Sequence, residues 1–94
     1  MEMNEKVYVL IVKSSERGQS SYSIDVEAFS SKEAGDRALD LKVQTESKNL
    51  KEGSGRCRVD RWSRQTPAGE IRGAEMTSRM WTVDVSLRPV QVKD

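Results

Sequence analysis

Hydrophobic and polar positions follow different periods in the first half of the chain, and each period indicates a different element. Residues 7–12 are six consecutive apolar or aromatic side chains, which is typical of a central strand covered on both faces. Residues 22–29 alternate between apolar and polar side chains, as in a strand with one face in water. The polar segment 14–21 between them contains Gly18 and is typical of a hairpin turn.

The segment 30–47 has the pattern of a capped helix. Ser30 is expected to be the N-cap, and Glu33 to complete a capping box. Gly35 costs about 1 kcal/mol relative to alanine inside a helix, so it is either merely tolerated or required for a close contact with backbone. The side of the helix expected to pack on the sheet consists of Ala34, Ala38, Leu41 and Thr45.

Two further sides of this helix are candidate partner surfaces. Leu39 and Val43 form an apolar pair away from the predicted packing side, and such a pair would anchor a protein partner. Asp36 and Asp40, together with Glu33, form an acidic side. This acidic side is either a docking surface that fixes the register of a basic partner or simply a solvated helix face.

Residues 56–65 indicate a third strand in which the position of one aromatic ring is ambiguous. Cys57 and Val59 favour one face of that strand, and Trp62 falls on the other face. A bulge near Asp60 and Arg61 would return Trp62 to the core. Without a bulge, Trp62 is exposed among arginines.

The remainder of the chain predicts a turn and one further strand. Residues 66–69, Thr-Pro-Ala-Gly, form a turn signal. Residues 70–79 are either a long loop or the start of a return strand interrupted at Gly73. Residues 81–87 predict a fourth strand, which Pro89 is expected to end. Its inward residues are expected to be Trp81, Val83, Val85 and Leu87.

These elements predict a single α+β domain over residues 1–94, with the order β-β-α-β-β. The expected architecture is a four-stranded, mostly antiparallel sheet with one helix packed on one face. Because residues 7–12 are apolar on both faces, the second face of the sheet needs another cover. Residues 70–79 are one candidate for that cover, and a homodimer or another protein partner is the alternative.

Composition narrows the chemistry that is available. The chain has no histidine and one cysteine, Cys57, so it lacks the usual ligands for zinc, haem or copper and the commonest general base. No constellation suits nucleophilic or paired-carboxylate catalysis, and we therefore expect a non-enzymatic protein without cofactor or metal. A lone cysteine, no long apolar segment and no leader pattern predict a cytoplasmic protein that does not enter a membrane.

Charge is distributed unevenly, and it marks the main candidate site. Residues 1–47 contain six basic and nine acidic side chains, whereas residues 48–94 contain ten basic and six acidic ones. Arginines that flank an aromatic ring suit single-stranded nucleic acid, since they neutralise phosphates while the ring stacks on a base. The residues of this candidate site are Arg56, Arg58, Arg61, Trp62 and Arg64. The alternative is that Trp62 belongs to the core and the arginines line a solvated strand face, paired across the sheet with Asp84 and Glu27.

The stretch from Tyr22 to Ala38, YSIDVEAFSSKEAGDRA, resembles the strand-to-helix segment of many small proteins from bacteriophages and mobile elements. The chain as a whole is similar in style to anti-CRISPR and other anti-defence proteins, which are short and lack catalytic residues. That resemblance implies a stoichiometric inhibitor that sterically blocks a host defence or nucleic-acid-processing complex. It implies no particular site residues, because such families share no common site motif. A small RNA- or ssDNA-binding accessory domain is the alternative function.

Overall fold

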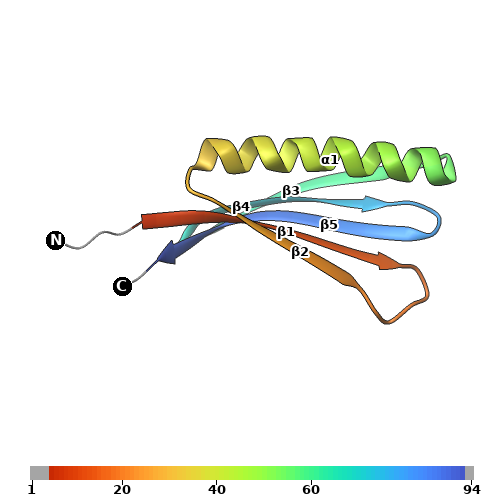
Figure 1. Ribbon diagram of the computed structural model, residues 1–94, viewed down its shortest axis with the longest axis horizontal. Coiled ribbons are helices and arrows are strands. Elements are labelled where there is room, and N and C mark those ends of the chain that lie inside the picture. The colour runs from red at the N-terminus through yellow and green to blue at the C-terminus, as the bar shows by residue number, and fades with distance from the viewer. Residues whose placement is uncertain (1–4, 93–94) are drawn as a thin grey trace.

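In a computed structural model, which describes residues 5–92, the protein is one antiparallel sheet with a single long helix along one face (Figure 1). The elements in chain order are β1 (Glu5–Glu16), β2 (Ser23–Phe29), α1 (Lys32–Ser54), β3 (Arg58–Thr66), β4 (Gly69–Thr77) and β5 (Trp81–Val92). Neighbouring strands lie in the order β2-β1-β5-β4-β3, and every pair is antiparallel. The α+β class and the helix on one face are confirmed. The prediction of four strands is wrong, because the described residues form five.

The additional strand is β4, in the segment that the sequence left ambiguous. It pairs with β3 through the turn at Pro67 and Ala68, and with β5 on its other side. Ala74 and Met76 are fully buried, so this strand contributes to the core. Its alternation is hard to recognise in the sequence because Gly73 and Ala74 place no large side chain at two central positions. Since β4 lies within the sheet, it does not cover the sheet's second face.

Helix α1 begins one residue later than predicted and is longer. Ser31, not Ser30, is the N-cap, and its Oγ accepts a hydrogen bond from the Ala34 N–H at 3.1 Å. The helix continues to Ser54 and ends at Gly55, which has the left-handed backbone (φ 78°) that glycine adopts without a steric penalty. The predicted start is therefore wrong by one residue, and the predicted end at residue 47 is about two turns too early.

The side of α1 that packs on the sheet also differs from the prediction. Leu39 and Val43 are 1% and 3% exposed and lie in the core with Gly35, whereas Leu41 is 64% exposed. The side with Gly35, Leu39 and Val43 faces the sheet because it carries two branched aliphatic side chains, whereas the predicted side consisted mainly of alanines. The contact expected at Gly35 is present, but with side chains: an added Cβ would lie 3.0 Å from Leu87 Cδ1.

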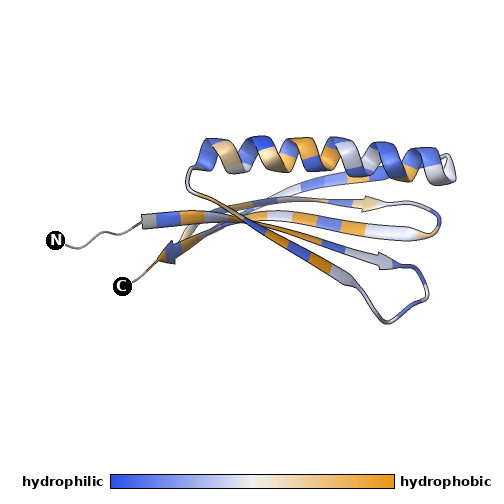
Figure 2. Cartoon of the chain, viewed as in Figure 1, coloured by the Kyte–Doolittle hydropathy of each residue, from blue (hydrophilic) through white to orange (hydrophobic). Residues whose placement is uncertain are grey.

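The core lies between α1 and the central strands. Its buried residues are Leu10, Val12, Leu39, Val43, Ala74, Met76, Val83, Val85 and Leu87. Along the strands, hydrophobic and polar residues alternate, so one set of side chains faces the helix and the other faces away (Figure 2). Strand β1 is apolar on both faces as predicted, and its outer residues Val7, Val9 and Ile11 are only half-buried. We call the sheet face that points away from α1 the open face.

Strand β5 continues beyond the residue that was expected to end it. Pro89 pairs with Tyr8, and the strand runs on to Val92. Strand β4 pairs with β5 only as far as Leu87, so Pro89 lies beyond that ladder. A proline is tolerated where its missing N–H is not needed by a neighbouring strand. This position therefore fits an extended strand rather than a strand end.

Candidate functional site

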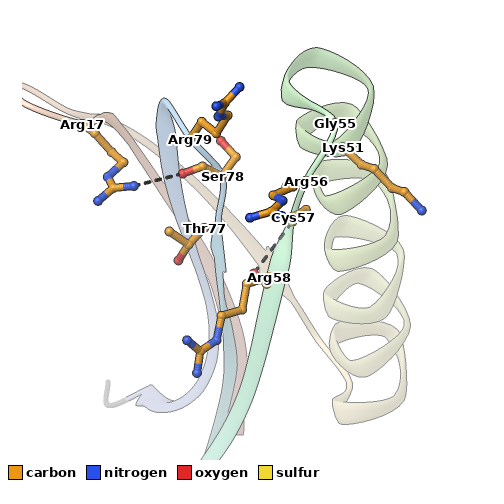
Figure 3. A pocket seen from close by; sticks show the side chains of 9 residues that line it. All are labelled: Arg17, Lys51, Gly55, Arg56, Cys57, Arg58, Thr77, Ser78 and Arg79. Atoms are coloured by element: carbon orange, nitrogen blue, oxygen red, sulfur yellow. Dashed lines mark hydrogen bonds between the residues drawn. The ribbon is translucent and has the colours of Figure 1, made fainter.

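Basic side chains surround an open cleft at one end of the molecule. The cleft has a volume of about 530 Å³ and lies between the carboxyl end of α1, the start of β3 and the turn that joins β4 to β5 (Figure 3). Its lining residues are Arg17, Lys51, Gly55, Arg56, Cys57, Arg58, Thr77, Ser78 and Arg79. Five of these nine are basic and none is acidic. We call this feature the basic cleft.

The backbone at the helix end brings Arg56 to the cleft. The Gly55 N–H donates to the Lys51 carbonyl oxygen at 2.7 Å, which closes the last turn of α1 and redirects the chain. Ser54 supports the same bend. Its hydroxyl donates to the Leu50 carbonyl oxygen at 2.8 Å and lies 3.1 Å from the Arg56 carbonyl oxygen. Strand β3 then begins at Arg58, so that two arginines directly follow the helix.

The β4–β5 turn forms the opposite wall and is held by a buried serine. Ser78 is 4% exposed, and its Oγ accepts a hydrogen bond from the Trp81 N–H at 3.0 Å. The Ser78 N–H donates to the Trp81 carbonyl oxygen at 2.9 Å, which leaves Arg79 and Met80 at the tip. The Arg17 N–H donates to the Met80 carbonyl oxygen at 2.7 Å, so the end of β1 is fastened to this turn.

Most of the positive charge in the cleft is not neutralised by the protein itself. The ion pairs of residues 5–92 involve the basic groups of Lys32, Arg58, Arg61 and Arg72. Within that range, Lys51, Arg56 and Arg79 therefore have no carboxylate partner, and Arg17 donates only to the Ser78 carbonyl oxygen at 3.5 Å. Because these positive charges repel one another, the cleft attracts an anion that would neutralise them.

The arrangement of the cations favours an extended ligand over a small one. In Figure 3, Arg56 lies between the helix end and the turn, Arg79 stands at the tip of the turn, and Arg17 lies on the far side of that turn. Arg58 follows along β3 and pairs with Asp60 at 3.1 Å, but both side chains are more than half exposed. The charges are distributed around the turn instead of converging on one point, which suits a chain of phosphates.

Cys57 lies in the cleft as a free thiol. Burial raises its pKa, because desolvation disfavours the thiolate. A raised pKa is the opposite of what a nucleophilic or metal-binding cysteine needs. Within the described part of the chain, moreover, no group of three or more acidic, cysteine or histidine side chains could hold a metal ion. The cleft therefore offers charge for binding but no activated group.

The structure brings only part of the predicted arginine site together. Arg56 and Arg58 line the cleft, whereas Arg61 turns to the helix side of the sheet and pairs with Asp40 at 3.3 Å. Asp36 is similarly engaged by Arg72 at 2.8 Å and by Lys32 at 2.9 Å. The acidic side of α1 is therefore bound largely by arginines of the chain's own sheet, instead of facing solvent alone.

Trp62 and Arg64 lie apart from the cleft. Trp62 pairs directly with Gly73 in an uninterrupted β3–β4 register, so the bulge considered in the sequence is not present. The ring lies on the open face and is 39% exposed. A Cβ added at Gly73 would lie 2.5 Å from the ring, so the glycine is what allows the ring to lie against the sheet. Of the two alternatives for Trp62, exposure beside arginines is the one found.

The cleft also contains residues that sequence reasoning did not select. Arg17 and Arg79 are separated from Arg56 by more than twenty residues on either side, and only the strand order brings them together. Leu39 and Val43, which were expected to anchor a partner, are buried core residues and present no free surface. The sequence did indicate that Arg79 lies at a strand boundary, next to Ser78. It did not indicate that the end of the helix lies beside that boundary.

Comparisons with protein-family models, curated proteins and solved structures find no match to this chain. No helix among the described residues is both long and apolar enough to cross a membrane.

Proposed function

We propose that this protein is a non-enzymatic binding protein that holds single-stranded nucleic acid through the phosphates at the basic cleft. The observation that carries the proposal is the cleft lining, with five basic side chains and no acidic one. Phosphate contacts supply most of the affinity in such complexes, and they need cations that are spread along a path.

Two features support a polyanion over a protein partner at this site. Four of the five cations, all except Arg58, lack an ion-pair partner within residues 5–92, so a phosphate that binds to them breaks no existing salt bridge. The cleft is also open to solvent, which suits a strand that passes through it. The proposal retains Arg56 and Arg58 from the arginine site predicted in the sequence. It omits Arg61, which is paired with Asp40, and Trp62, which lies on another surface.

The inhibitor function implied by the resemblance to anti-defence proteins stays a prediction. Its expected apolar anchor, Leu39 and Val43, is buried, and its acidic residues Asp36 and Asp40 are occupied by arginines of the same chain. Of the surfaces expected to bind a protein partner, the helix pair is closed, and the uncovered face of the sheet is the apolar surface that stays exposed. The geometry therefore favours the nucleic-acid proposal.

Charge reversal in the cleft tests the proposal. Arg56→Glu combined with Arg79→Glu is expected to reduce the affinity for a fluorescent single-stranded oligonucleotide at least tenfold, as measured by anisotropy at low salt. With the wild-type protein, the logarithm of the affinity should fall with the logarithm of salt with a slope of about −2 to −3, since each phosphate contact contributes about −0.7. The double variant should show a shallower slope.

Arg37→Glu is the matched control, because Arg37 is an exposed arginine in the first half of α1 and does not line the cleft. One control reversal and one cleft reversal change the net charge equally, so Arg56→Glu alone is compared with Arg37→Glu. Equal losses for the two single variants, or no retention of the oligonucleotide by the wild type, would overturn the proposal. Thermal unfolding of each variant shows that the fold is intact.

A further inference from the structure

The open face carries more exposed apolar surface than a solvated sheet face should. Ile24 and Val26 of β2 are 51% and 64% exposed, although each belongs to an alternating strand. Their partners in β1, Lys13 and Ile11, place them on the open face next to half-buried valines. Trp62 lies on the same face at its other edge. Contiguous apolar surface of this kind marks an interaction site.

The register divides the open face into rows that cross all five strands. The central row consists of Trp62, Gly73, Ser86, Ile11 and Val26. Two residues away on each strand, in one direction, lies a row made of Asp60, Glu75, Asp84, Lys13 and Ile24. In the other direction lies a row made of Arg64, Ile71, Arg88, Val9 and Ala28. We call these the acidic row and the basic row.

The acidic row is unfavourable in an isolated chain. Asp60 is directly opposite Glu75, and Glu75 is directly opposite Asp84, so three carboxylates occupy adjacent strands. Like charges that face each other across strands destabilise a sheet. Only Asp60 has an ion-pair partner within residues 5–92, the exposed Arg58. Lys13 lies opposite Asp84 in this row, but its ammonium group stands over the Tyr22 ring at 4.3 Å and forms no ion pair among residues 5–92. Glu75 and Asp84 are therefore left without an ion-pair partner in the described part of the chain.

A second copy supplies counter-charges for two of these three carboxylates, Asp60 and Asp84. If two open faces pack together about a two-fold axis that runs along the central row, each strand lies over its own symmetry mate with reversed direction. The acidic row of one copy then lies over the basic row of the other. Asp60 faces Arg64 of the second copy, Asp84 faces its Arg88, and both pairs occur twice because a two-fold interface is self-complementary.

We propose that the protein forms a homodimer in which the open faces of two sheets pack together about this axis. Aligned sheets pack about 10 Å apart with strand directions within about 30°, a geometry compatible with this arrangement. The five strands are seven to twelve residues long. With strands about 4.8 Å apart, and about nine residues of each strand in the shared face, that face measures roughly 24 by 30 Å. The resulting area, about 700 Å² per copy, is close to the roughly 800 Å² of a typical stable interface. Ile11, Val26 and Trp62 lie along the axis of the interface, from one edge of the sheet to the other, with the charged rows on either side.

Sedimentation or light scattering with charge-swapped variants tests this proposal. The wild type is expected to give twice the 10.6 kDa of the chain at high concentration and to dissociate on dilution. Asp84→Arg places two arginine rows against each other and is expected to give a monomer. Arg88→Asp does the same with carboxylates. An equimolar mixture of the two variants should dimerise again, because each residue 84 then faces an opposite charge at residue 88.

Two further variants make the result specific. Asp25→Arg reverses a charge on the helix side of β2, where Asp25 pairs with Val12, and it should leave the dimer intact. Val26→Asp places a charge within the interface, at an exposed position that the monomer tolerates, and no mixture should restore the dimer.

A wild type that remains at 10.6 kDa, or variants that fail to dimerise when mixed although each is folded by circular dichroism, would overturn the proposal. Either result would leave the face to a different protein. Because none of the four substituted residues lines the basic cleft, the outcome is independent of nucleic-acid binding.

Discussion

The two faces of the sheet are built from the same alternating strands, yet they differ in what their apolar residues contact. On the covered face, Val85 and Met76 are fully buried beneath α1. On the open face, Val26 is 64% exposed, although it is as hydrophobic as the valines on the other side. The difference shows that an apolar row predicts a surface that needs a cover. It does not predict which element covers that surface, because the covering element lies elsewhere in the chain.

The charged residues show the same contrast. On the covered side, Arg61 and Arg72 find their partners on α1, in Asp40 and Asp36. On the open face, the carboxylates of Glu75 and Asp84 have no such partner within residues 5–92. The charges of the covered face are therefore paired within the single chain, whereas those carboxylates of the open face are left for the proposed second copy.

The largest effect is expected from a truncation on the covered face. Leu39→Ala should lower the free energy of unfolding by about 2–5 kcal/mol, because it removes a fully buried side chain and leaves a cavity. Leu41→Ala, two residues away in the same helix, should change it by less than about 0.5 kcal/mol, since Leu41 is largely exposed. Urea denaturation measures both. A larger loss for Leu41→Ala than for Leu39→Ala would mean that the helix packs on the side that the sequence first suggested.

A smaller effect is expected where the open face is closely packed. Gly73→Ala should destabilise the protein by about 1–3 kcal/mol, because the new Cβ would lie 2.5 Å from the Trp62 ring and 2.6 Å from the Val85 carbonyl oxygen. The displaced ring should also become more accessible to a fluorescence quencher such as acrylamide. Unchanged quenching together with unchanged stability would show that the ring does not rest on Gly73 in solution.

The smallest effect concerns the pH dependence of Cys57. Its folded pKa is raised by burial, so stability from this group is present below the ordinary thiol pKa and is lost as pH rises towards the folded value. Alkylation by iodoacetamide in the native protein should be slower than in urea at the same pH, and its rate should increase at a higher pH. A native rate equal to the unfolded rate would contradict the burial of the thiol beside the basic cleft.

Much of the fold could be predicted from local pattern. The strands β1, β2 and β5 and the helix appear in the sequence because their periods of two and of 3.6 residues are clear. Strand β4 could not be predicted with the same certainty, because Gly73 and Ala74 remove two large side chains from its alternation. The packing side of α1 was mispredicted in part: Ala38 packs against the core, but Leu41 is exposed, and the larger side chains of Leu39 and Val43 take the buried position.

The candidate site was predictable only in part for a similar reason. Arg56 and Arg58 were recognised because they belong to one basic stretch of sequence. The same stretch also contains Arg61 and Arg64, which alternation sends to opposite faces of β3. Arg17 and Arg79 join the cleft from distant positions.

The sequence by itself determined the class of fold, the helix and most strands, the absence of histidine and the excess of arginine in the second half. These properties depend on residue identity and on contacts between near neighbours in the chain. Only the tertiary structure decided which arginines share a cleft, which carboxylates face one another and which apolar face stays uncovered. Those outcomes depend on strand order and register, and hence on contacts between residues far apart in sequence, which no local pattern specifies.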